Sequence, residues 1–301
     1  MILSLAFVYV FIALGFIAKK IFKDQINPKT LTLISVYFTQ PFVAMWGFST
    51  ARLHYDQFIV PFIYLVIIIA LLIPTILLSK IIFEDKKNRA IFSIAGFVGN
   101  TGNIGIPLGI AIFGESSVIY TTLINLANVF VVYIIGVYIY SRGSFDIKTS
   151  LKNIIKIPII PVSIIAIMLN TSGFVPSGEF KEFLKMGAYA GIVLQLFLLG
   201  TFLEGIKIRE IHPKLFIGTL TQKFLIVPFA TALLLSFISL SPTIKAILLM
   251  EMLTPLAVAN INLASLYECR PKDVTTLILL STLLFIPIVF ILEFIVSHYY
   301  I

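Results

Sequence analysis

The chain contains a series of apolar stretches near twenty residues in length, and each can cross about 30 Å of hydrocarbon as a helix. Short polar or charged segments separate them. A strand of an outer-membrane barrel would instead alternate apolar and polar residues over about ten positions. The pattern predicts an all-α integral membrane protein with ten spans, at 2–20, 31–51, 58–80, 89–113, 118–140, 153–170, 184–203, 215–240, 243–266 and 274–297.

Composition and charge exclude other classes of protein. Hydrophobic residues make up 59% of the chain and charged ones only 12%, too few polar side chains to cover a water-soluble fold. The net charge of +8 would suggest nucleic acid in a soluble protein, but here 18 of the 22 Lys and Arg residues follow odd-numbered spans. The positive-inside rule then predicts a multi-pass protein of the cytoplasmic membrane, with both termini outside and no nucleic-acid partner.

Ten spans can divide into two halves of five, 1–141 and 142–301, which must then have opposite orientations. Prolines recur in like places, with Pro107 in the fourth span and Pro255 in the ninth. Together with the topology, this recurrence predicts an inverted repeat, an arrangement in which substrate sites form near the bilayer midplane at broken helices.

The centres of the fourth and ninth spans are poor sequences for an uninterrupted helix, because glycine and proline weaken it. A break inside a membrane is tolerated only where protein or a watered cavity encloses it, and helix N-termini there attract anions. The alternative is that these small residues only let helices pack closely. The candidate substrate-binding residues are Asn100, Thr101, Gly102, Asn103, Gly105, Pro107, Thr254, Pro255, Asn260 and Asn262.

Charged residues inside spans are costly and are functional candidates by default. Glu251, one turn before Pro255, is the predicted ion-coupling residue; the alternative is a structural carboxylate bonded to a neighbouring helix. Lys223, five residues before Pro228, is a candidate to attract an anion, or else a lysine that extends to the cytoplasmic surface.

Four polar side chains are candidates for a pathway beside these breaks. Asn125 and Asn128 share one helix face, and Gln40 and Gln195 occupy like positions in the two halves. Ordinary helix packing is the alternative for all four. The numerous Phe and Tyr residues fit lipid contact and the membrane interface. The three His and the single Cys lack metal-ligand spacing, and no nucleotide motif is present, so neither metal, cofactor nor enzymatic activity is expected.

The stretches GNTGNIGIPLG from Gly99 and MLTPLAVANINLA from Met252 resemble the auxin efflux carrier family, which includes plant auxin exporters and prokaryotic permeases for malate-like carboxylates. The resemblance implies a relative of the bile-acid/sodium symporter fold. It implies a scaffold domain at about 1–52 and 152–206, and a transport domain at about 57–141 and 212–298 that moves as an elevator. A homodimer through the scaffold is a candidate assembly.

The expected function is secondary active transport of a small organic anion, malate-like or auxin-like, coupled to H⁺ or Na⁺ or to neither. Alternatives are a sodium-coupled symporter of a larger amphipathic anion, a gated channel, and a membrane sensor that binds a ligand without moving it.

Overall fold

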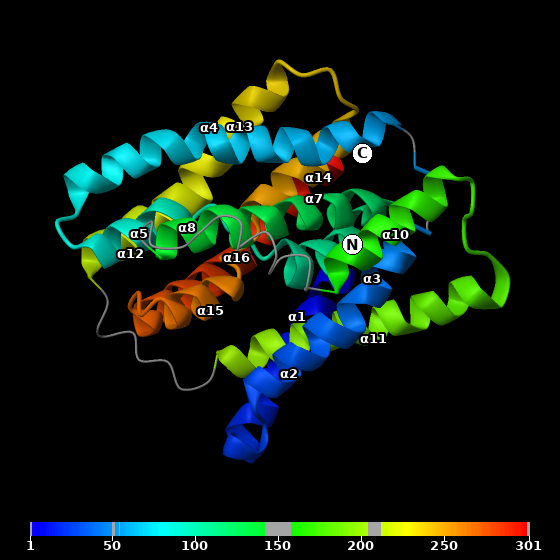
Figure 1. The fold of residues 1–301 in the computed structure, drawn as a ribbon, viewed down its shortest axis with the longest axis horizontal. Coiled ribbons are helices and arrows are strands. Elements are labelled where there is room, and N and C mark those ends of the chain that lie inside the picture. Colours follow the sequence, from blue (N-terminus) through cyan, green and yellow to red (C-terminus); the bar gives the residue numbers. More distant parts are fainter. Residues whose placement is uncertain (1, 50–51, 54, 142–157, 204–211, 300–301) are drawn as a thin grey trace. The chain divides into compact units, whose positions relative to one another are not determined.

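The protein is built from helices and connecting loops in the residues that the computed structural model describes, 2–49, 52–53, 55–141, 158–203 and 212–299 (Figure 1). Among them the only β-type pairing is one isolated bridge. The chain forms two compact units. The first comprises Met1–Ile59, Gly102–Leu126 and Asn153–Gly205, and the second comprises Val60–Thr101, Ala127–Lys152 and Ile206–Ile301.

The expected domains differ from these units in one segment. Residues 102–126, which the family resemblance assigns to the transport domain, cluster in the first unit with the expected scaffold segments. The boundary expected at 141–142 adjoins a segment outside the described residues. The inverted repeat and the scaffold–transport division stay predictions.

In the first unit, the long helices α1 (Ile2–Phe22) and α11 (Gly178–Phe202) pack closely at two glycines. A Cβ on Gly15 would overlap the carbonyl oxygen of Phe197, and one on Gly200 would overlap that of Ile12. Small residues let membrane helices approach in this way. The remaining helices are α2 (Pro28–Ile34), α3 (Gln40–Gly47), α6 (Ile106–Phe113), α10 (Ile159–Thr171), the 3₁₀ turns η1 (Lys23–Gln25), η3 (Tyr55–Phe58) and η5 (Glu115–Ser117), and the first part of α7 (Val118–Phe130).

The second unit holds the end of α7 and most of α4 (Ile59–Ile82), the most apolar of the five described helical segments that are long enough to cross a membrane. Its further helices are α5 (Lys86–Ile94), α8 (Val137–Tyr140), α12 (Pro213–Thr221), α13 (Val227–Ser236), α14 (Pro242–Leu253), α15 (Ala259–Leu266) and α16 (Pro271–Tyr299).

Five helical segments of the described chain are long and apolar enough to cross a membrane. They are Ile59–Ile82, Glu115–Tyr140, Gly178–Phe202, Pro213–Ser236 and Pro271–Val296. The all-α prediction and these membrane-spanning helices are therefore confirmed, whereas the full count of ten stays a prediction.

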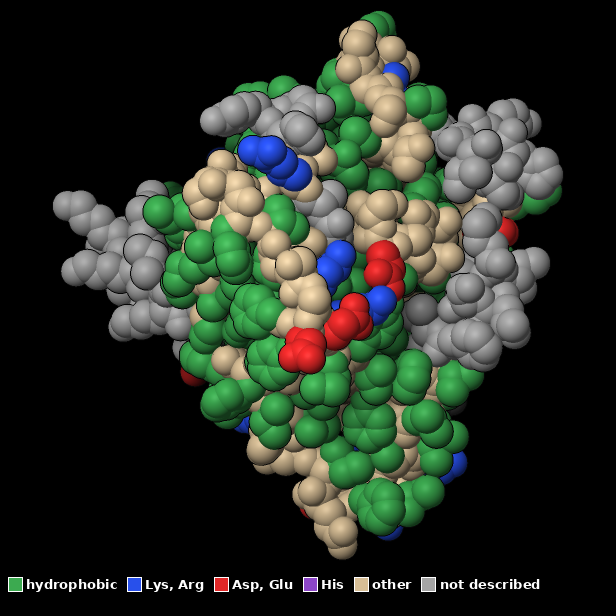
Figure 2. All heavy atoms as spheres, turned by 90° about the vertical axis from the view of Figure 1, so that its right-hand side faces the viewer, with side chains coloured by type: hydrophobic (Ala, Val, Ile, Leu, Met, Phe, Trp, Pro, Cys, Tyr) green, Lys and Arg blue, Asp and Glu red, His purple; other side chains and the backbone are tan. Residues whose placement is uncertain are grey.

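Hydrophobic side chains also predominate on the surface (Figure 2). On α4 they form an exposed stripe at helical spacing. A helix of a water-soluble protein would instead bury its apolar face and expose its polar one. The stripe consists of Phe62, Val66, Ile69, Ile73, Leu77 and Ile81.

Three π-helical turns each precede a proline. The turns are η2 (Ser35–Thr39), η4 (Thr101–Gly105) and η8 (Gln222–Ile226), and the prolines are Pro41, Pro107 and Pro228. A proline ring displaces the carbonyl four residues earlier, which here lies inside each π-turn. The wider turn accommodates that displacement, and such turns are frequent at functional sites. A fourth π-turn, η6 (Val131–Gly136), has no proline after it.

Candidate functional site

Both interruptions predicted from the sequence are present in the structure. The fourth span leaves the α-helix after Ile94 and resumes it at Ile106, with a π-turn between. The ninth span leaves it after Leu253 and resumes at Ala259. Glycines, threonines and a proline in these segments remove helical bonds or compete for them, which explains why the helices break here.

The two breaks meet in the second unit as a short antiparallel pairing. Asn100 N donates to Pro255 O at 2.8 Å, and Ala257 N donates to Val98 O at 2.9 Å. We call the segments 98–101 and 254–257 the crossing. These bonds satisfy backbone groups that the broken helices leave free, which is a requirement for irregular backbone at membrane depth.

Gly99 permits the close approach at the crossing. A Cβ at this position would lie 2.6 Å from Thr254 Oγ1 and 3.1 Å from Lys223 Nζ. Both distances are shorter than an ordinary van der Waals contact. The absence of a side chain at Gly99 therefore lets a polar hydroxyl and an ammonium group approach the backbone of the fourth span.

Asn128 braces the first segment of the crossing, residues 98–101. Its amide nitrogen donates to Gly99 O at 2.8 Å and to Thr101 Oγ1 at 3.0 Å, and its Oδ1 accepts from Tyr64 Oη at 3.0 Å. Both amide hydrogens are thus used. The structure gives the predicted pathway residue Asn128 a bracing role.

Asn260 braces the second segment, residues 254–257, in a similar way. Its amide nitrogen donates to Ala257 O at 3.1 Å and, at 3.4 Å, to Val98 O, while its Oδ1 accepts from Tyr140 Oη at 3.2 Å. A tyrosine and an asparagine therefore hold each side of the crossing. Ser281 Oγ adds a bond from Leu256 N at 3.1 Å.

Other polar groups here have no hydrogen-bond partner among the described residues. Asn100 Nδ2 and both carboxylate oxygens of Glu251 are in this state, and Glu251 is 0% exposed. Thr254, also buried, donates its hydroxyl to the backbone oxygen of Glu251 at 2.7 Å and leaves the carboxylate free. Since a buried polar group without a partner is costly, these groups are places for a ligand, a water molecule or an ion.

Lys223 supplies a positive charge beside them. It lies in η8 and is 1% exposed. The alternative interpretation, a lysine that extends to the protein surface, therefore does not hold. Its charge and that of Glu251 are close enough to interact, although none of the described ion pairs joins them. A lysine, a carboxylate and a free amide thus lie at one pair of broken helices.

A family model for membrane transport proteins matches residues 1–292 of the chain. An uncharacterized transporter from Methanocaldococcus jannaschii is 31% identical over 215 residues, which are 68% of this chain and 68% of that protein. The chain belongs to the membrane transport protein family. The resemblance to auxin efflux carriers is confirmed, and the protein is a transporter and not an enzyme.

The other predicted site residues of this transporter, apart from Asn262 of the second unit, lie in the first unit. Gly102 packs against Asn125, whose Oδ1 would be 2.9 Å from a Cβ on the glycine. The remaining residues are Asn103 and Gln40, which are half-buried, and Gly105, Pro107 and Gln195, which are buried. Gln195 Oε1 has no partner among the described residues. The side chain of Asn262 is outside the described ones.

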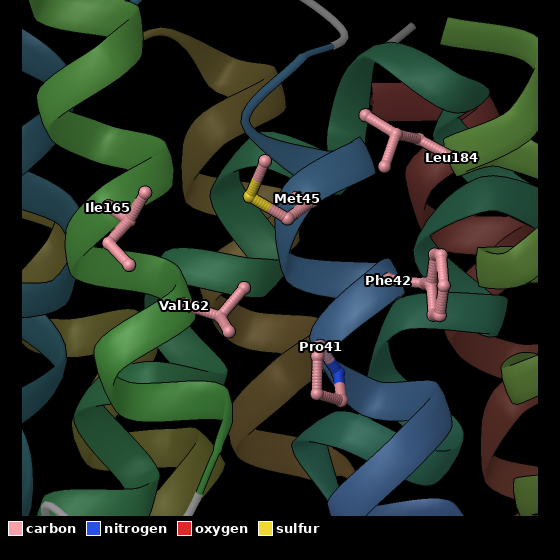
Figure 3. A pocket seen from close by; sticks show the side chains of 6 residues that line it. All are labelled: Pro41, Phe42, Met45, Val162, Ile165 and Leu184. Carbon is pink, nitrogen blue, oxygen red and sulfur yellow. The ribbon is translucent and has the colours of Figure 1, made fainter. Parts of the chain in front are cut away.

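The first unit of the transporter also contains an apolar cavity of about 240 Å³ (Figure 3). Pro41, Phe42 and Met45 of α3 line it together with residues of α10 and α11, and no polar surface contributes. It offers nothing to hold a charged group. Gln40 precedes Pro41 in sequence but does not line the cavity.

Sequence reasoning missed both bracing tyrosines. Tyr64 and Tyr140 were expected among the lipid-facing or interfacial aromatics, but they are only 1% and 0% exposed. This expectation was wrong because a buried tyrosine is stable where its hydroxyl finds an acceptor, and each asparagine provides one. Val60, Tyr64 and Ile68 follow one another at four-residue spacing, which places them on one face of α4, and all three are buried. This shared face with two aliphatic residues was the signal in the sequence that Tyr64 faces inward.

Proposed function

We propose that this transporter carries a small organic anion, a malate-like or auxin-like carboxylate, across the cytoplasmic membrane as a secondary active carrier. One observation carries the proposal: the Lys223 ammonium lies against Gly99, at a crossing where Asn100 Nδ2 and the Glu251 carboxylate have no hydrogen-bond partner within the described part of the chain. A lysine and an amide donor suit a carboxylate.

Glu251 is the proposed coupling residue. When it is ionised, it competes with the substrate for the positive charge of Lys223, because opposite charges attract strongly in a low-dielectric interior. A proton or sodium ion on Glu251 removes this competition and frees Lys223 to bind the anion. The two binding events then favour one another, and release of either ligand promotes release of the other.

The proposed movement is alternating access of the elevator type. The crossing would move across the membrane with the transport domain, while the scaffold would stay fixed in the bilayer. Its support is the family and the pair of broken helices, an arrangement that secondary transporters use at the midplane. We also propose ten spans, both termini outside, and a homodimer through the scaffold.

The test is uptake into proteoliposomes of labelled malate, succinate, citrate and indole-3-acetate under an imposed H⁺ or Na⁺ gradient. Saturable uptake with counterflow of at least one carboxylate is expected, and the active gradient identifies the coupling ion. Flux linear in substrate concentration would indicate a channel, and binding without flux would indicate a sensor; either result contradicts the proposal. Lys223→Gln should raise the KM for the anion at least about tenfold, the effect of one charge-assisted bond.

A further inference from the structure

A second pocket in the second unit, of about 500 Å³, lies among α13, α14 and α16. None of the crossing residues lines it. Apolar side chains form most of its walls, and one basic residue stands among them. The residues that line it include Ala232, Leu235, Leu240, Lys245, Leu249 and Ile295.

Of the described residues that line this pocket, only Lys245 is charged. It is half-buried in the first turn of α14, and none of the described ion pairs includes it. The positive end of the α14 dipole lies at the same place, where Ser241 caps the helix. Charge complementarity therefore calls for an anionic group at this end of the pocket.

The rest of the pocket calls for an apolar chain. Its volume is several times that of a small carboxylate. Such a ligand would gain little binding free energy from the apolar walls that Leu235, Leu249 and Ile295 form. Phe229 of α13 and Phe237, which directly follows this helix, are 72% and 81% exposed. In a membrane-spanning helix such apolar side chains face lipid, so the pocket lies on a lipid-facing helix.

We propose that this pocket binds one anionic phospholipid, with its phosphate at Lys245 and an acyl chain along Leu249 and Ile295. Basic pockets between membrane helices recognise lipid headgroups by this combination. The site is independent of the transported substrate, and its occupancy would fix α13 against α14, the helix that leads to Glu251.

The test is native mass spectrometry of the full-length protein in detergent, with phosphatidylglycerol or phosphatidylcholine of identical acyl chains added. Wild type should bind phosphatidylglycerol about fivefold more tightly, the effect of one lysine near an anionic headgroup. Lys245→Gln should abolish this preference. Lys272→Gln, which changes an exposed lysine at the other end of α16, should retain it.

A second pair of variants tests the acyl chain. Ala232 is exposed and lines the pocket, so Ala232→Trp should fill it without disturbing the core and should weaken binding of both lipids, whereas Ala232→Ser should not. Melting temperatures confirm that each variant is folded. Equal binding of the two lipids by wild type, or an unchanged preference in Lys245→Gln, overturns the proposal. So does displacement of the lipid by glycerol 3-phosphate at equal concentration, which would show that a free phosphate suffices.

Discussion

The crossing contains two sets of buried polar side chains that differ in their partners. Asn128 and Asn260 use their amides fully. Each accepts from a tyrosine and donates to the broken helices, Asn128 to one backbone carbonyl and the Thr101 hydroxyl, Asn260 to two backbone carbonyls. Asn100 and Glu251 have side-chain atoms that find no hydrogen-bond partner among the residues described. One residue type, asparagine, thus occurs in both sets, and only its neighbours distinguish a brace from a candidate ligand.

The difference follows from the cost of broken helices in a membrane. Each break frees backbone groups that water would satisfy in a soluble protein, and here protein must do so. An amide that meets this need has no donor left for a substrate. We therefore expect the braces to determine stability and the unpaired set to determine transport.

The largest expected effect comes from the unpaired set. Glu251→Gln removes the charge but retains the size of the side chain, so gradient-driven uptake should be abolished while the melting temperature changes little. Uptake and unfolding are measured on the same purified protein. Unchanged uptake under both H⁺ and Na⁺ gradients would contradict the coupling role of Glu251.

Gly99→Ala should affect both properties, because it places a methyl group against Thr254 Oγ1 and Lys223 Nζ. Overpacking of this kind costs about 1–3 kcal/mol of unfolding free energy. Denaturant unfolding in detergent measures it. The double variant Gly99→Ala with Thr254→Ala should recover part of the lost unfolding free energy, since it removes the atom nearest to the added methyl group. No recovery would contradict a close contact between Gly99 and the Thr254 side chain.

The braces should affect mainly stability. Asn128→Ala leaves Gly99 O and Tyr64 Oη without their partner and should lower the unfolding free energy by about 2 kcal/mol, near the upper limit for interhelical bonds in membranes. Tyr64→Phe, which removes one bond, should cost about half as much. Asn100→Ala is the matched control: it should leave stability nearly unchanged and reduce uptake. Equal destabilisation by Asn100→Ala and Asn128→Ala would remove the distinction between the two sets.

The smallest effect is expected at a polar group outside the membrane. Burial raises the pKa of Asp85, but the N–H groups of Lys87 and Asn88 and the nearby Arg270 outweigh it and hold this pKa below its usual value. The stabilisation is present above about pH 4 and is lost as the pH falls through the lowered pKa.

Asp85 and Arg270 are partly exposed, so their 3.0 Å ion pair should contribute less than about 1 kcal/mol. Asp85→Asn keeps a side chain that can cap α5 and should reduce the acid-induced fall in melting temperature. An acid sensitivity identical to wild type would show that Asp85 does not contribute to it.

The sequence predicted the features that depend on local composition. Long apolar stretches predict membrane helices because each must satisfy its own backbone. Glycine and proline in the fourth and ninth spans predicted both breaks, and proline also explains the π-turn that contains Lys223. The family resemblance followed from the same two segments.

Only the tertiary structure decided which polar side chains are braces and which lack partners. Asn128 lies 29 residues from Gly99, and Asn260 lies 120 residues from Tyr140, so no local pattern reports these bonds. The burial of Lys223 beside Gly99 likewise depends on packing between distant spans. Local propensity determines where a helix breaks, but the free energy of a buried polar group depends on its partners, and packing brings those together.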